Sequence, residues 1–97
     1  MDKKYELYFD TDHYNKRVSN DKNIEEDFIG ESNNYKEVLA KFNEYCEKAE
    51  YLANKAKTCK RYNVHIIEGY TTILSKNFYS KVWLKEVGRL EVDNKWN

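Results

Sequence analysis

One short segment of this sequence has side chains that could bind a metal ion. Asp10, Thr11, Asp12 and His13 bring two carboxylates and an imidazole together, and these groups are ligands for divalent cations. The twelve-residue calcium loop also needs a glycine and a distal glutamate at fixed positions, and no such pattern follows Asp10. Because short polar side chains favour turns, we expect a turn here, with no metal and no cofactor.

A second set of residues could support nucleophilic catalysis. His65 follows Cys46 and Cys59, and a cysteine–histidine pair needs a reachable thiol and an orienting acid. Cys46 lies among apolar residues at helical spacing, which predicts a buried free thiol, and no pattern brings Cys59 to His65 with a third group. We therefore assign no catalytic residues, and a small metal- or thiol-dependent enzyme is only the second alternative function.

Acidic residues are concentrated before the middle of the chain. Residues 1–34 have a net charge of −4 and residues 35–97 a net charge of +4. Carboxylates spaced along a loop can imitate a phosphate backbone and occupy a basic groove of another protein, whereas a solvated loop is the simpler interpretation. The candidate acidic partner-binding residues are Asp21, Glu25, Glu26, Asp27 and Glu31.

Basic residues follow at the expected end of a helix. Such a group could contact phosphates while an adjacent aromatic ring stacks on a base, or it could simply complement the helix dipole. The whole chain has 17 basic and 17 acidic residues, whereas nucleic-acid-binding modules are usually strongly basic. Direct nucleic-acid binding is therefore our first alternative, through Lys55, Lys57, Lys60, Arg61 and Tyr62.

Aromatic residues give the strongest indication of function. Nine tyrosines, four phenylalanines and two tryptophans make up 15% of the 97 residues, more than a core of this size can bury. Exposed tyrosine and tryptophan favour protein interfaces, although tyrosine is also an ordinary strand residue and single exposed aromatics are common. The candidate aromatic contact residues are Tyr8, Tyr70, Tyr79 and Trp83.

A long amphipathic helix is expected to position these groups. Steps of three and four between apolar residues predict a helix over residues 34–57, with Asn34 as N-cap, Glu37 completing a capping box and Ser32 as a second candidate cap. Its apolar positions form one stripe: Tyr35, Val38, Leu39, Phe42, Tyr45, Cys46, Ala49, Leu52, Ala53 and Ala56.

Strands are expected on either side of this helix. Alternation predicts a strand over 4–8 and a return strand over 13–18, followed by an acidic loop over 19–33 with one helical or irregular turn that ends at Gly30. After the helix, the patterns predict strands over 62–67 and 70–74 and a hairpin loop at Lys76-Asn77. Residues 78–87 fit a strand, which we prefer, or a helix between Asn77 and Gly88, and residues 90–92 fit a short last strand.

These elements predict one α+β domain over residues 1–97. A small antiparallel sheet of three to five strands packs on one long amphipathic helix, in the order β(β)αββ(β), with the C-terminal strands within 62–92. One helix leaves the other sheet face uncovered, which would suit a protein partner or a second copy of the chain. We expect neither a signal peptide nor a membrane span, and hence a cytoplasmic protein.

The predicted function is non-enzymatic binding of another protein. We find no family motif. In composition the chain resembles small accessory proteins of Gram-positive phages and mobile elements, being short, without proline and rich in Lys, Asn, Glu and Tyr. Some of those proteins inhibit host defence systems such as CRISPR effectors by covering nucleic-acid-binding surfaces. The resemblance therefore implies an inhibitor of a nucleic-acid-binding complex in the host cytoplasm.

Overall fold

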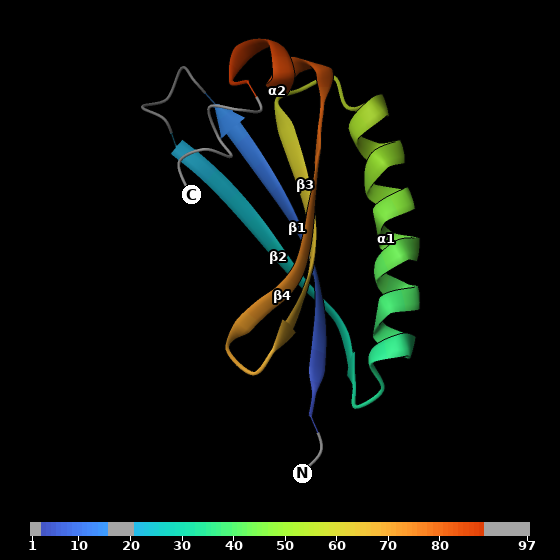
Figure 1. Ribbon diagram of the computed structural model, residues 1–97. Helices are drawn as coiled ribbons and strands as arrows, with labels where there is room; N and C mark the ends of the chain where they lie inside the picture. The colour runs from blue at the N-terminus through green and yellow to red at the C-terminus, as the bar shows by residue number, and fades with distance from the viewer. Residues whose placement is uncertain (1–2, 16–20, 89–97) are drawn as a thin grey trace.

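The protein folds into a four-stranded antiparallel sheet with one long helix on one face (Figure 1). The computed structural model describes residues 3–15 and 21–88. The elements are β1 (Tyr5–Asn15), β2 (Asp21–Ser32), α1 (Tyr35–Lys55), β3 (Lys60–Glu68), β4 (Thr71–Tyr79) and α2 (Lys81–Glu86). The strands lie in the order β2-β1-β3-β4, so strands from before and after α1 form one sheet. The predicted α+β class is confirmed.

Helix α1 begins and ends close to the predicted positions. The Asn34 side chain accepts a hydrogen bond from the backbone N–H of Lys36 at 2.9 Å, which satisfies one of the free donors of the first turn. Glu37 does not complete the expected box with Asn34. Its carboxylate instead accepts a hydrogen bond from the Ser32 hydroxyl at 3.0 Å, and that hydroxyl accepts one from the Asn34 N–H.

The main core lies between α1 and the sheet. Helix α1 buries a stripe with steps of three and four residues, while β1 and β3 bury alternate residues against it. The helix contributes Val38, Phe42, Cys46, Ala49 and Ala53, and the strands contribute Leu7, Phe9, Tyr62, Val64 and Ile66. Because successive strand residues point to opposite faces, the intervening residues of β1 and β3 lie on the face away from α1.

The expected turn at Asp10-Thr11-Asp12 does not form. Strand β1 continues through these residues to Asn15, pairing with β2 on one side and β3 on the other. The turn propensity is overcome because Asp12 gains an ion pair with Arg61 of β3. His13 to Asn15, expected in a return strand, thus belong to β1, and the rest of that expected strand lies outside the described residues.

The expected acidic loop is instead strand β2. Its residues pair with β1 from Tyr5 opposite Ser32 to Asn15 opposite Asp21, and the register shifts once, leaving Ile29 as the extra residue of a β-bulge. The bulge lets Ile29 pack against the core although the alternation is broken. Pairing along the whole of β1 outweighs the low strand propensity of the acidic residues.

The β3–β4 hairpin turns earlier than expected. Glu68 pairs with Thr71, so Gly69 and Tyr70 form the two-residue turn, and Gly69 has the positive φ of +66° that such turns require. Lys76 and Asn77, expected as the hairpin loop, lie within β4 and pair with Val64 and Asn63.

The C-terminal part of the described chain is a helix where a strand was preferred. Strand β4 ends at Tyr79, and Ser80, not Asn77, caps α2. The Ser80 hydroxyl accepts hydrogen bonds from the N–H groups of Lys60 and Trp83 and donates one to the Thr58 carbonyl. The expected strand over residues 90–92 lies outside the described residues. No helix in the described ranges is long and apolar enough to cross a membrane.

Candidate functional site: the sheet face opposite α1

Helix α2 covers one end of the sheet face that α1 leaves free. Trp83 is completely buried there, with its ring against the rings of Tyr14 and Tyr79 at centroid distances of 5.8 and 6.0 Å. Beneath it, Arg61 Nη2 binds Asp12 Oδ2 at 2.8 Å, and the Arg61 guanidinium lies 5.3 Å from the centre of the Trp83 ring. This end of the face is therefore a small second core that contains a buried ion pair.

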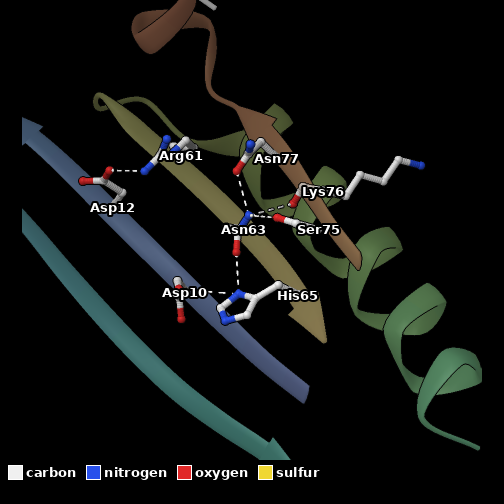
Figure 2. Close-up of polar contacts among 8 residues, drawn as sticks. All are labelled: Asp10, Asp12, Arg61, Asn63, His65, Ser75, Lys76 and Asn77. Atoms are coloured by element: carbon white, nitrogen blue, oxygen red, sulfur yellow. Dashed lines mark hydrogen bonds and ion pairs between the residues drawn. The ribbon is translucent and has the colours of Figure 1, made fainter. Parts of the chain in front are cut away.

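A polar network occupies the middle of the same face (Figure 2). The side-chain amide of Asn63 donates hydrogen bonds to Ser75 Oγ at 2.9 Å and to Asn77 Oδ1 at 2.8 Å. Its carbonyl oxygen lies 2.6 Å from His65 Nδ1. An amide oxygen can only accept, so Nδ1 of His65 carries the proton. In the neutral ring Nε2 then has a free lone pair, and it makes no hydrogen bond to any described residue.

Asp10 lies next to this network. One of its carboxylate oxygens is 3.7 Å from His65 Nδ1, and the other is buried without a hydrogen bond in the described structure. Burial, with the nearby carboxylates of Glu26 and Asp27, raises the pKa of Asp10 to about 6, although Arg61 opposes the shift. Burial lowers the pKa of His65. At neutral pH the pair is thus mainly a charged carboxylate beside a neutral imidazole.

An aromatic cluster with an acidic border lies on the β1–β2 side of the face. The Tyr8 ring stacks on His65 at a centroid distance of 5.2 Å and contacts the edge of Phe28 at 5.5 Å. Phe28 has 53% of its surface exposed. The register places further carboxylates beside these rings, because Glu6 pairs with Glu31, and Glu26 pairs with Asp10. We call this surface the acidic aromatic patch, formed by Glu6, Tyr8, Glu26, Phe28 and Glu31.

The carboxylates of the patch act together on Tyr8. Its hydroxyl donates a hydrogen bond to Glu6 Oε1 at 3.3 Å. Burial, Glu6 and then the more distant Glu26 and Glu31 all raise the pKa of Tyr8, so the phenol stays protonated. Lys4 neutralises part of this charge through a 3.2 Å ion pair with Glu31. The patch is therefore negative at neutral pH and has an apolar centre.

Comparison with known proteins adds no family to this description. No family model matches the chain, and neither characterised protein sequences nor solved structures give a match.

The predicted acidic residues lie on strand β2 and are divided between its two sides. By alternation from the paired residues of β1, Glu26 and Glu31 face away from α1, while Glu25 and Asp27 lie on the α1 side. Glu25 binds His13 Nε2 at 3.1 Å. The side chain of Asp21 lies outside the described residues. The acidic group is thus an acidic edge strand and not one continuous surface.

The predicted aromatic contact residues are also separated. Tyr8 belongs to the patch, and Tyr70 is completely exposed in the β3–β4 turn. Tyr79 and Trp83 are buried in the second core, which corrects the expectation that they are available to a partner. Phe28 was not among the predicted contact residues, because in the expected helical turn it would share no surface with Tyr8.

The predicted basic group is not assembled into one surface. Tyr62 is buried in the main core, so its ring cannot stack on a base, and the Arg61 guanidinium is engaged with Asp12 and Trp83. Lys55 lies 4.8 Å from the centre of the Tyr51 ring on α1. Of the five residues, the three lysines are left as candidate phosphate contacts, of which Lys55 and Lys57 are exposed and Lys60 is half-buried.

The residues that could bind a metal ion or act as a nucleophile are likewise separated. Asp10 and Asp12 share one face of β1, and by alternation His13 lies on the other. No three acidic, histidine or cysteine residues of the described chain lie close enough to hold a metal ion. Cys46 and Cys59 are buried free thiols, and burial followed by Glu86 and Asp12 raises the pKa of Cys59 to about 11. A reactive thiolate requires a lowered pKa.

Proposed function

We propose that this protein binds another protein with a positively charged surface through the acidic aromatic patch. The observation that carries the proposal is the exposed ring of Phe28, which lies against Tyr8 on a sheet face with several carboxylates. Protein interfaces commonly combine an aromatic contact at the centre with a polar border. An arginine or lysine of the partner can cover the Phe28 ring and reach Glu6 or Glu26 at the same time.

The sign of the charge indicates the class of partner. Negative groups on β1 and β2 repel nucleic acid but attract the basic surfaces that bind it. Carboxylates on this surface would take the place of phosphates, and the partner's nucleic-acid-binding surface would be blocked. This is the action we expect of an inhibitor from a phage or mobile element, and the host cytoplasm is then its place of action. The proposal involves no catalysis.

Affinity capture with paired variants tests the proposal. The tagged protein is incubated with a bacterial lysate, with and without nuclease, and washed with 0.5 M salt. The test variant is Glu26→Gln/Glu31→Gln, at two exposed residues of the patch, and the control is Glu47→Gln/Glu50→Gln on exposed positions of α1. Both double variants change the net charge equally, so a difference in capture between them depends on where the charges lie.

The expected result is a protein that is captured despite nuclease, is lost with the test variant and is retained by the control. Equal capture by both variants would overturn the proposal. Nuclease-sensitive capture that is lost with Lys57→Gln/Lys60→Gln would instead establish nucleic acid as the ligand. That outcome would move the function to Lys57 and Lys60, which follow α1.

A further inference from the structure

The outer edge of β2 is open to pairing with a further strand. This strand is the last in the order β2-β1-β3-β4, and within the described chain only β1 pairs with it. It has 12 residues, the longest strand of the sheet, and lies at the outside of the sheet in Figure 1. The backbone N–H and C=O groups on its outer side can pair with an added strand, as in complexes formed by strand addition.

A groove lies beside one end of this edge. It has a volume of about 570 Å³ and separates the last residues of β2 from the first half of α1. Leu7, Val38 and Tyr45 form its apolar part, while Glu37, Lys41 and Glu44 line it from the helix. Lys41 forms a 3.9 Å ion pair with Glu44, so Glu37 and Glu44 together still outweigh the one positive charge. The space beside Gly30 is empty, because a Cβ built on this residue would have no atom within 4 Å. A lysine or arginine fits such a groove, with its apolar stem on the floor and its charge beside Glu37, which has no ion pair with a described residue.

The charges of β2 determine what can pair with it. Glu25, Glu26 and Asp27 are consecutive, and pairing two copies of β2 would bring like charges together across the new ladder. A second copy of the chain is therefore a poor occupant. An extended basic segment would instead meet carboxylates on both sides of the strand.

We propose that β2 binds an extended, lysine- or arginine-rich segment of a partner protein as a fifth strand, with one long cationic side chain in the groove at Gly30. The segment pairs with the regular run of β2 before the bulge at Ile29, and its end reaches the groove beyond. This inference rests on the proposed function and names the form of the basic partner. Strand addition supplies main-chain hydrogen bonds, which a purely electrostatic contact lacks.

The test uses two synthetic peptides of equal charge. One is an octapeptide of alternating lysine and valine, and the other has the same sequence with every internal backbone nitrogen methylated, which removes the donors of both strand edges. Binding is measured by titration calorimetry at low salt, and hydrogen exchange reports the amides of β2. We expect the methylated peptide to bind at least about tenfold more weakly. The unmodified peptide should slow exchange at the outward-facing amides of β2.

A groove variant gives an independent measurement. Gly30→Leu fills the groove at a position without positive φ, and Asn54→Leu adds the same side chain to an exposed position of α1 as the control. We expect weaker binding of the lysine peptide to Gly30→Leu only. Equal binding of the two peptides would overturn strand addition, even if Gly30→Leu failed to fold. The proposed function would then still stand if the Glu26→Gln/Glu31→Gln variant lost its captured protein, so the two failures are distinguishable.

Discussion

Tyr8 and His65 stack almost parallel across β1 and β3, with an interplanar angle of 12°. This contact joins the two parts of the uncovered sheet face, because Tyr8 belongs to the acidic aromatic patch and His65 to the network around Asn63. Asn63 and Tyr8 hold the imidazole in place from two directions. The polar middle of the face is therefore ordered by its own side chains and offers a partner a fixed surface.

The first prediction concerns Phe28. Phe28→Ala should leave the free energy of unfolding within about 1 kcal/mol of the original, because half of the ring is already exposed. The same change should lower the affinity for the captured partner at least about tenfold, as expected for an aromatic residue at the centre of an interface. Urea unfolding and a binding titration measure the two effects. Tyr51→Ala, at a ring that is 60% exposed on α1, should change neither.

The second prediction concerns the pH dependence due to Asp10. Its pKa rises from 3.8 to about 6 on folding, so between these values the folded state holds a proton that the unfolded chain has lost. The contribution of Asp10 to stability is thus complete below about pH 4 and is lost as the pH rises through 6. Asp10→Asn removes this loss. The free energy of unfolding of this variant, relative to that of the original protein, should increase by about 1–2 kcal/mol between pH 4 and pH 7. This is less than the full pKa shift implies, because water still reaches the carboxyl.

His65 provides the control for this measurement. Its pKa is lowered on folding, so its contribution to stability has the opposite sign and is lost as the pH falls below about 6.5. His65→Gln should therefore gain stability relative to the original protein toward acid. A stability difference between Asp10→Asn and the original protein that stays constant from pH 4 to pH 7 would contradict the assignment to Asp10.

Periodicity in the sequence was sufficient to predict the helix and the core but not the strand partners. The apolar steps of α1 are local, and the helix formed where they indicated it. Strand β2 has no such local signal, because its acidic residues are stabilised by pairing with β1, which is a long-range effect. The same holds for Asp12, whose turn propensity is overcome by Arg61, 49 residues away.

The candidate site was predicted only in part for the same reason. The acidic residues and Tyr8 were recognised from the sequence as candidate contact residues. Which of them share a face depends on the register of β1 against β2, which the sequence did not indicate. Trp83 was predicted to be a contact residue because no part of the predicted core accommodated its ring. The Ser80 cap turns the chain so that α2 returns over the sheet and buries that ring. The available signal in the sequence was Ser80, because serine is a preferred N-cap residue and Trp83 follows three positions later.

The third prediction concerns the buried ion pair. Arg61→Met should lower the free energy of unfolding by about 3 kcal/mol, because the Asp12 carboxylate is only 2% exposed and would lose its counter-ion. Asp12→Val/Arg61→Met should recover most of this loss, since no unpaired charge remains. Urea unfolding of the two single variants and the double variant measures the coupling. Equal losses for Arg61→Met and the double variant would show that packing against Trp83, and not the charge pair, is what matters.

The fourth prediction concerns Ser80, whose hydroxyl holds three segments together. It receives hydrogen bonds from β3 and α2 and donates one to the residue at position 58, and the side chain is fully buried. Ser80→Ala leaves two N–H groups and one carbonyl without this partner, so we expect a loss of about 2 kcal/mol in urea unfolding. The loss should be accompanied by increased exposure of Trp83, visible as a red shift of its fluorescence. Thr72→Ala, at an exposed position of β4, should produce neither change. A Ser80→Ala variant as stable as Thr72→Ala would mean that α2 is held by the Trp83 ring alone.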